Sequence, residues 1–101
     1  MEKSKFEKYS NIAHNHSIYN EEELNNSKKC GCFYCLRIYD PKKIKEWVDE
    51  KNGKKTALCP FCEIDSVIAE SNEYELNDEL LKYMNDYWLL SSNFLWRRNI
   101  F

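Results

Sequence analysis

Five cysteines lie between residues 30 and 62 of this 101-residue chain, and four of them form two C-x-x-C pairs. The first pair is Cys32 and Cys35, the second is Cys59 and Cys62, and Cys30 stands outside both. A C-x-x-C turn directs two sulfurs at one point, so two such pairs supply the four thiolates of a tetrahedral zinc site. An odd number of cysteines fits poorly with a closed set of disulfides. The spacing therefore predicts a single zinc ion bound by these two pairs.

Other interpretations of the cysteines are weaker. Cys30 stands two residues before Cys32 and is the alternative ligand at that corner, although we expect it to be a spare, partly buried thiol. A redox-active C-x-x-C pair requires a βαβ context, which the sequence lacks. Four protein ligands leave no open metal position, so the zinc is expected to be structural and to contribute on the order of 10 kcal/mol to folding.

The elements that must position the cysteines divide into three segments of one predicted domain, residues 1–101. We expect an N-terminal helical segment over 1–27, a zinc module over 28–70, and a C-terminal helix with an aromatic tail over 71–101. The predicted fold class is α+β. Its centre is a small four-cysteine zinc-ribbon or treble-clef-like module with short strands, a zinc finger flanked by N-terminal and C-terminal helices.

Two helices are predicted before and within the zinc module. Asn20 followed by Glu23 has the spacing of a capping box, which predicts a helix over residues 20–26. Asp40-Pro41 is typical of a helix start, and Asn52-Gly53 is typical of a helix end. Between them, apolar residues at helical spacing predict one buried face, formed by Ile44, Trp47 and Val48.

The C-terminal part of the chain contains one strong helical pattern. Asn77 is a typical N-cap, and it precedes a broad apolar stripe made of Leu80, Leu81, Met84, Tyr87 and Trp88. The apolar positions of residues 63–70 fit either a strand or a helical turn, and this alternative stays open.

Three strings of sequence surround the cysteines: Cys30–Cys35 (CGCFYC), Thr56–Cys62 (TALCPFC) and Ile64–Ile68 (IDSVI). Through them the chain resembles a family of small bacterial cytoplasmic proteins with paired C-x-x-C motifs, from about residue 16 to residue 88. The resemblance implies a cytosolic bacterial protein and brings no activity with it. Glu63 departs from the glycine that such sequences carry after the second pair, and the tail after Trp88 is longer.

Charge and hydropathy restrict the classes of partner. The chain has 15 Lys and Arg against 17 Asp and Glu, a net charge of −2, but residues 28–55 carry nine basic and four acidic side chains. This weakly acidic total gives no general attraction to nucleic acid or anionic membranes. No apolar run is long enough for a membrane span, and the first residues lack the apolar core of a secretory signal, so we expect a cytoplasmic protein without membrane contact.

Binding of another protein is the favoured function. Apolar and aromatic residues continue to the C-terminus, and Trp88, Phe94 and Trp96 are candidate anchors for a partner protein or for a second copy of the chain. An inhibitor encoded by a phage or another mobile element is a hypothesis consistent with the small size of the chain.

Nucleic-acid binding is the alternative function. The lysine-rich face of residues 28–55 would supply the contacts, with Lys42, Lys43 and Lys45 as candidates.

Catalysis is not expected. A treble-clef nuclease needs a general-base histidine just after the strand that follows the first C-x-x-C pair, whereas His14 and His16 both precede that pair. The sequence contains no P-loop, G-x-S-x-G or His-Glu-x-x-His motif. The acidic residues beside the second pair are expected to shape hydrogen bonding around the sulfurs. The sequence therefore predicts a zinc protein that binds a macromolecule without chemical turnover.

Overall fold

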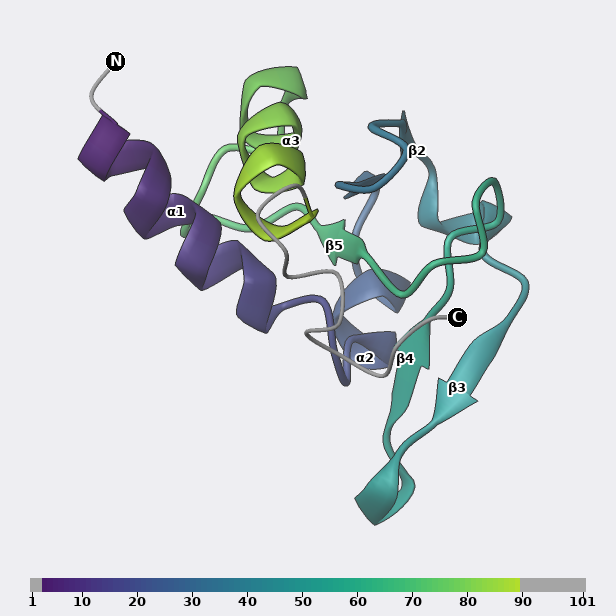
Figure 1. Ribbon diagram of the computed structural model, residues 1–101. Helices are drawn as coiled ribbons and strands as arrows, with labels where there is room; N and C mark the ends of the chain where they lie inside the picture. Colours follow the sequence, from purple (N-terminus) through teal and green to yellow (C-terminus); the bar gives the residue numbers. More distant parts are fainter. Residues whose placement is uncertain (1–2, 90–101) are drawn as a thin grey trace.

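The computed structural model describes residues 3–89 and shows a small α+β fold of short elements (Figure 1). In chain order these elements are α1 (Lys3–Asn15), α2 (Glu21–Asn25), β1 (Cys30–Cys32), β2 (Ile38–Tyr39), the 3-10 turn η1 (Pro41–Lys43), β3 (Trp47–Asp49), the turn η2 (Lys51–Gly53), β4 (Lys55–Ala57), β5 (Val67–Ala69), α3 (Asp78–Met84) and the π-helical turn η3 (Asn85–Leu89).

Two antiparallel sheets form the middle of the molecule. The first has the strand order β2-β1-β5, with Cys30 paired to Tyr39 on one side and Cys32 paired to Val67 on the other. The second is the β3–β4 hairpin, which extends away from the two longer helices (Figure 1). Helices α1 and α3 pack against each other beside β5.

Strand β5 lies between two clusters of buried side chains, because neighbouring residues of a strand point to opposite faces. Val67 contributes to a cluster that surrounds the cysteines, whereas Ile68 contributes to a cluster between α1 and α3. The close approach of α3 explains the glycine in β1. A Cβ atom on Gly31 would lie 3.1 Å from methyl groups of both Leu76 and Leu81. The sheet therefore packs directly on the C-terminal helix at this point.

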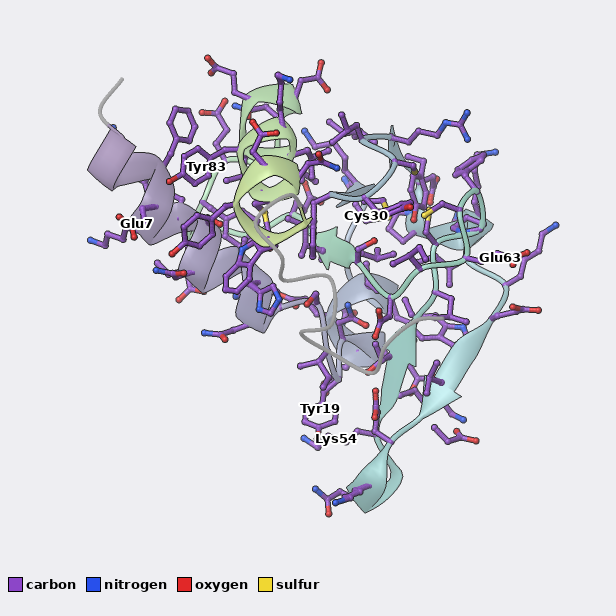
Figure 2. The ribbon with its side chains drawn as sticks, viewed as in Figure 1. Glu7, Tyr19, Cys30, Lys54, Glu63 and Tyr83 are labelled. Atoms are coloured by element: carbon purple, nitrogen blue, oxygen red, sulfur yellow. The ribbon has the colours of Figure 1, made fainter. Side chains whose placement is uncertain are left out.

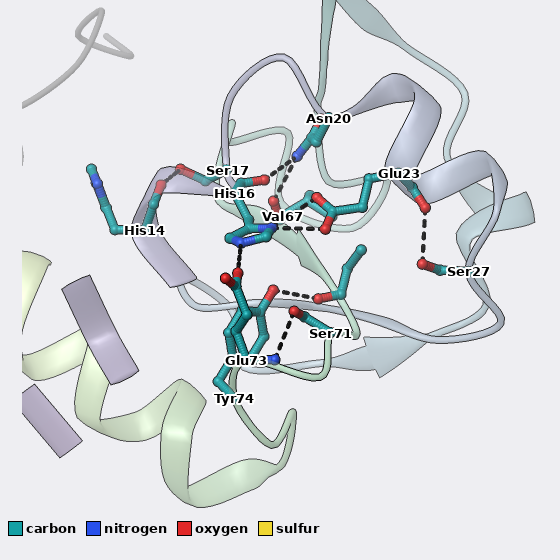
Figure 3. A network of polar contacts seen from close by, with 11 residues as sticks. His14, His16, Ser17, Asn20, Glu23, Ser27, Val67, Ser71, Glu73 and Tyr74 are labelled. Carbon is teal, nitrogen blue, oxygen red and sulfur yellow. Dashed lines mark hydrogen bonds and ion pairs between the residues drawn. The ribbon is translucent and has the colours of Figure 1, made fainter. Parts of the chain in front are cut away.

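Asn20 joins the start of α2 to both sheets. Figure 3 shows its bonds to His16 and Val67. Its amide nitrogen donates to the carbonyl oxygens of His16 and Val67, each at 2.9 Å, and its amide oxygen accepts from the backbone N–H of Ala57 at 3.0 Å. The predicted capping box is wrong, because among the described residues Asn20 makes no side-chain capping hydrogen bond and the Glu23 carboxylate contacts the His16 ring instead. Buried polar groups need partners, and these three bonds take precedence over the cap.

The predicted helix between Asp40 and Gly53 is also wrong, except at its start, where the Asp40 side chain caps the turn η1 and Pro41 is the first residue of that turn. The chain makes the short turn η1 and then the strand β3, which includes Trp47 and Val48 and pairs with β4. Aromatic and β-branched side chains suit a strand. Asn52 and Gly53 both have positive φ, 69° and 74°, and close a hairpin instead of ending a helix. Asn-Gly is a strong hairpin signal, and here it outweighs the helical spacing of the apolar residues.

The C-terminal elements settle two expectations. Residues 67–69 of the ambiguous segment form a strand. The Asn77 side chain accepts a hydrogen bond from the N–H of Leu80 at 2.9 Å, which confirms Asn77 as the N-cap of α3. Over the described part of the chain, no helix has the length and apolar character that crossing a bilayer would require.

Candidate metal centre

The first knuckle is the turn that follows β1, from Cys32 to Leu36. The backbone N–H groups of Tyr34 and Cys35 point at the Cys32 sulfur, with N–S distances of 3.3 and 3.4 Å. The turn closes where the Leu36 N–H donates to the Cys32 carbonyl oxygen at 2.8 Å and the Cys32 N–H donates to the Arg37 carbonyl oxygen at 2.9 Å. Leu36 has a φ of 67°, in the left-handed region that glycine prefers.

The second knuckle, Cys59 to Glu63, repeats this geometry. The Phe61 N–H points at the Cys59 sulfur at 3.4 Å. The Glu63 N–H donates to the Cys59 carbonyl oxygen at 2.8 Å, and the Cys59 N–H donates to the Ile64 carbonyl oxygen at 3.0 Å. Glu63 has a φ of 66°, in the left-handed region that glycine prefers. The two turns are therefore equivalent in backbone structure.

The two knuckles bring four sulfurs together. The Sγ atoms of Cys32, Cys35, Cys59 and Cys62 all lie within 4.8 Å of one another. The shortest distances join the knuckles, 3.6 Å between Cys32 and Cys62 and 3.7 Å between Cys35 and Cys59. Four sulfurs at about 2.3 Å from a central ion would be about 3.8 Å apart in a regular tetrahedron. The cluster therefore has the ligand number and dimensions to hold a metal ion.

Burial and contacts among the sulfurs shift the four thiol pKa values in opposite directions. The pKa values of Cys35 and Cys59 fall, and those of Cys32 and Cys62 rise. The hydrogen bond with Cys32 lowers the pKa of Cys35 to about 7. Contacts with Cys32 and Cys62 lower the pKa of Cys59 below its ordinary value of 9.0, whereas burial raises the pKa of Cys32. Thiolates are the form of cysteine that binds metals. A cation among the sulfurs would offset the repulsion that several thiolates would otherwise experience.

Cys30 lies outside the four-sulfur cluster. It is fully buried in β1, between its sheet partners Tyr39 and Ala69. Burial raises the pKa of the Cys30 thiol to about 12, so this sulfur stays protonated at neutral pH. The structure thus places Cys30 outside the four-sulfur cluster and fully buried in the core, whereas the sequence analysis expected a partly buried thiol.

Two polar side chains support the first knuckle from elsewhere in the chain. The Ser66 hydroxyl lies 3.0 Å from the Cys32 sulfur. The Asn85 amide nitrogen, at the start of η3, donates to the carbonyl oxygens of Phe33 and Tyr34 at 3.0 and 3.1 Å. Such neighbouring groups orient metal ligands. Sequence reasoning missed both residues, because nothing in the sequence near Asn85 links it to a turn about fifty residues away.

The aromatic anchor candidates are only partly within the described residues. The indole ring of Trp88 stacks on His14, with ring centroids 3.8 Å apart, and its N–H donates to the Ser10 hydroxyl at 2.9 Å. Trp88 therefore packs on α1 and is half-buried. Phe94 and Trp96 lie outside the described residues. Protein binding through this segment stays a prediction.

The three candidate lysines lie at and just after η1. Lys42, Lys43 and Lys45 are all exposed. Among residues 3–89 the ion pairs join His16 to two glutamates and Lys55 to Asp49, and none involves these three lysines. Their charges are therefore not compensated by an ion pair within the described structure.

His16 belongs to a separate polar cluster (Figure 3). Its Nδ1 atom lies 2.7 Å from one carboxylate oxygen of Glu23, and its Nε2 atom lies 2.9 Å from a carboxylate oxygen of Glu73. These contacts connect the end of α1 with α2 and with the loop after β5. Both ring nitrogens are thus occupied by contacts within the fold.

Comparison of the chain with protein-family models, curated proteins and solved structures finds no match.

Proposed function

We propose that the chain binds one zinc ion through Cys32, Cys35, Cys59 and Cys62. The observation that carries this proposal is the convergence of four sulfurs from two equivalent turns, at spacings close to those of a tetrahedral thiolate site. Tetrahedral four-sulfur sites hold zinc or iron, and zinc is the ion that commonly has a structural role there. Two knuckles joined to short antiparallel strands support the assignment to the zinc-ribbon or treble-clef class.

The zinc ion in this proposal is structural. Its four positions are filled by protein sulfurs, so neither water nor substrate has access to the metal. The site belongs to a cluster that includes Leu24, Tyr39 and Val67, so its formation is coupled to packing of the core. Metal binding of this type contributes on the order of 10 kcal/mol, which is comparable with the total stability of a small domain. The metal-free chain is therefore expected to lose its central fold.

The function supported by this site is binding without catalysis. The metal fastens two turns whose outer side chains are exposed, among them Tyr34 and Phe61. A rigid turn loses little conformational entropy when it meets a partner, which favours a recognition role. Thiolate ligands persist in a reducing compartment, which supports a cytoplasmic location.

Native mass spectrometry of the purified chain, together with circular dichroism, tests the metal site. We expect one zinc ion per chain and loss of the folded spectrum in excess EDTA. Replacing any one of the four cluster cysteines by serine is expected to weaken zinc binding strongly. The matched control is Cys30→Ser, which alters a buried cysteine outside the cluster and should retain the zinc. A metal-free chain that keeps its fold in EDTA would contradict the proposal.

A further inference from the structure

The exposed apolar side chains of the described structure gather on the two knuckles. Four large hydrophobic side chains are exposed by 40% or more in the described part of the chain, and three of them, Tyr34, Leu36 and Phe61, belong to the knuckles. Tyr34 and Phe61 occupy equivalent positions, each two residues after the first cysteine of its pair. With Arg37, these three residues are called the knuckle face.

Arg37 and Phe61 form a stacked pair within the knuckle face. The guanidinium carbon of Arg37 lies 4.6 Å from the centre of the Phe61 ring. The Phe61 ring also meets Tyr39 in an edge-to-face contact, with centroids 5.1 Å apart, so the core holds it in place. Arg37 is itself exposed and has no ion-pair partner among residues 3–89. Its guanidinium group is therefore a flat cationic surface that can stack on another ring and bind an anion.

More cations lie next to the knuckle face. Turn η1 directly follows β2, whose residue Tyr39 contacts Phe61, and it carries the exposed lysines 42 and 43. Lys45 lines a shallow hollow of about 230 Å³ together with Pro60 and Glu63, beside the second knuckle. Three carboxylates lie in the same region. Asp40 accepts a hydrogen bond from the N–H of Lys42 at 2.9 Å and keeps its charge, and Glu46 and Glu63 line the hollow with Lys45. Arg37 and the three lysines together still outnumber these carboxylates by one.

We propose that the knuckle face binds single-stranded nucleic acid. Bases would stack on Tyr34 and on the Arg37–Phe61 pair, and phosphates would contact the lysines at positions 42, 43 and 45. Exposed aromatic rings interleaved with cations are the chemistry that binds single strands without sequence preference. Unstacked bases are needed for such contacts, which favours a single strand over a duplex. The inference rests on the proposed zinc site, because the metal holds the two knuckles together.

The test measures the fluorescence anisotropy of labelled oligothymidine and oligouridine, each about 16 nucleotides long, as zinc-loaded protein is added at several salt concentrations. We expect saturable binding, with a slope of log K against log salt of about −2 for the three lysine–phosphate contacts. The two oligonucleotides show whether DNA, RNA or both are bound.

Variants separate stacking from charge. Tyr34→Leu and Phe61→Leu, at exposed positions, are each expected to weaken binding about 5- to 100-fold while the salt slope is retained. Replacing Lys42, Lys43 and Lys45 together by glutamine should reduce the magnitude of the slope by about 2. The matched control is Lys54→Gln, an exposed lysine near Tyr19 at the hairpin end, away from Glu63 of the second knuckle (Figure 2). This control is expected to bind as the wild type does.

Three results would overturn the inference. The first is no binding of either oligonucleotide by protein that holds its zinc, a result that leaves the proposed metal site intact. The second is a Lys54→Gln variant that weakens binding as much as the triple lysine replacement does, together with a Tyr34→Leu variant that binds as the wild type does. Such a result would mean that nucleic acid is attracted by the general positive charge and not by the knuckle face. The third is protein without zinc, which also overturns the proposed metal site. Zinc content measured on each sample distinguishes the third result from the first.

Discussion

Leu36 and Glu63 hold left-handed backbone conformations at matching positions of the two knuckles, with φ of 67° and 66°. Such a conformation costs an L-residue roughly 1–2 kcal/mol, whereas glycine loses about 0.5–1 kcal/mol more backbone entropy on folding. The difference predicts that Glu63→Gly stabilises the zinc-loaded protein by about 0.5–1 kcal/mol. Leu36→Gly should stabilise less, because the Leu36 side chain is only 40% exposed and its buried part would lose packing.

Thermal unfolding with zinc in constant excess measures this effect. A change of 1 kcal/mol corresponds to a shift of about 4–8 °C for a chain of this size, so Glu63→Gly should raise the midpoint by about 2–8 °C. The matched control is Glu46→Gly, at an exposed position without positive φ, which should lower stability by about 0.4–1 kcal/mol. If Glu63→Gly and Glu46→Gly are destabilising to the same extent, the left-handed turn is not a source of strain and the reasoning fails.

Three further predictions concern the fold around the site. Asn20→Ala should destabilise the protein by about 3 kcal/mol in urea unfolding, because three hydrogen bonds to buried backbone are lost, whereas Asn26→Ala, which removes one exposed bond, should cost less than about 1 kcal/mol. Gly31→Ala should cost about 1–3 kcal/mol by the same assay, since the added methyl group would lie 3.1 Å from a methyl group of Leu81. Burial, and then nearby carboxylates, raise the pKa of Tyr74 above 10.0 in the folded state. Its contribution to stability is therefore complete below pH 10, and above pH 10 it falls by up to about 1.4 kcal/mol per pH unit. Tyr74→Phe should make the loss of stability at alkaline pH less steep.

Each of these three predictions has a result that would contradict it. Equal losses for the two asparagine variants would mean that burial of the amide is unimportant. A neutral Gly31→Ala would show that α3 can move away from the sheet at little cost. If the free energy of unfolding falls equally above pH 10 in Tyr74→Phe and in the wild type, another group is responsible for the alkaline loss of stability.

The cysteine cluster could be predicted from sequence, because a C-x-x-C turn is a local structure and four thiolates have a clear chemical use. The cap of α3 was predictable for the same reason, since Asn77 and Leu80 are close in sequence. The conformation of Glu63 was not, because the second knuckle forces a residue other than glycine into the left-handed region.

The failures have two physical causes, one local and one long-range. The apolar spacing of residues 44–48 fits a helix as well as a strand, and pairing with β4 decided between them. Asn20 was expected to cap the helix that it begins, yet its amide forms hydrogen bonds with backbone groups far along the chain. Asn85 gave no local signal at all. The hairpin was decided by the nearby Asn52-Gly53 turn. For Asn20 and Asn85 the deciding hydrogen bonds are long-range, and pattern analysis of one sequence does not contain such pairings.

The side-chain amide of Asn20 bridges β4 and β5 as a backbone peptide group would, because it accepts a hydrogen bond from one strand and donates a hydrogen bond to the other. Its partners Ala57 and Val67 lie 37 and 47 positions further along the chain. During synthesis Asn20 therefore leaves the ribosome well before its hydrogen bonds to Ala57 and Val67 can form. A nascent chain stopped before residue 67 would lack the Val67 carbonyl oxygen, so Asn20 could make only its hydrogen bonds to His16 and Ala57.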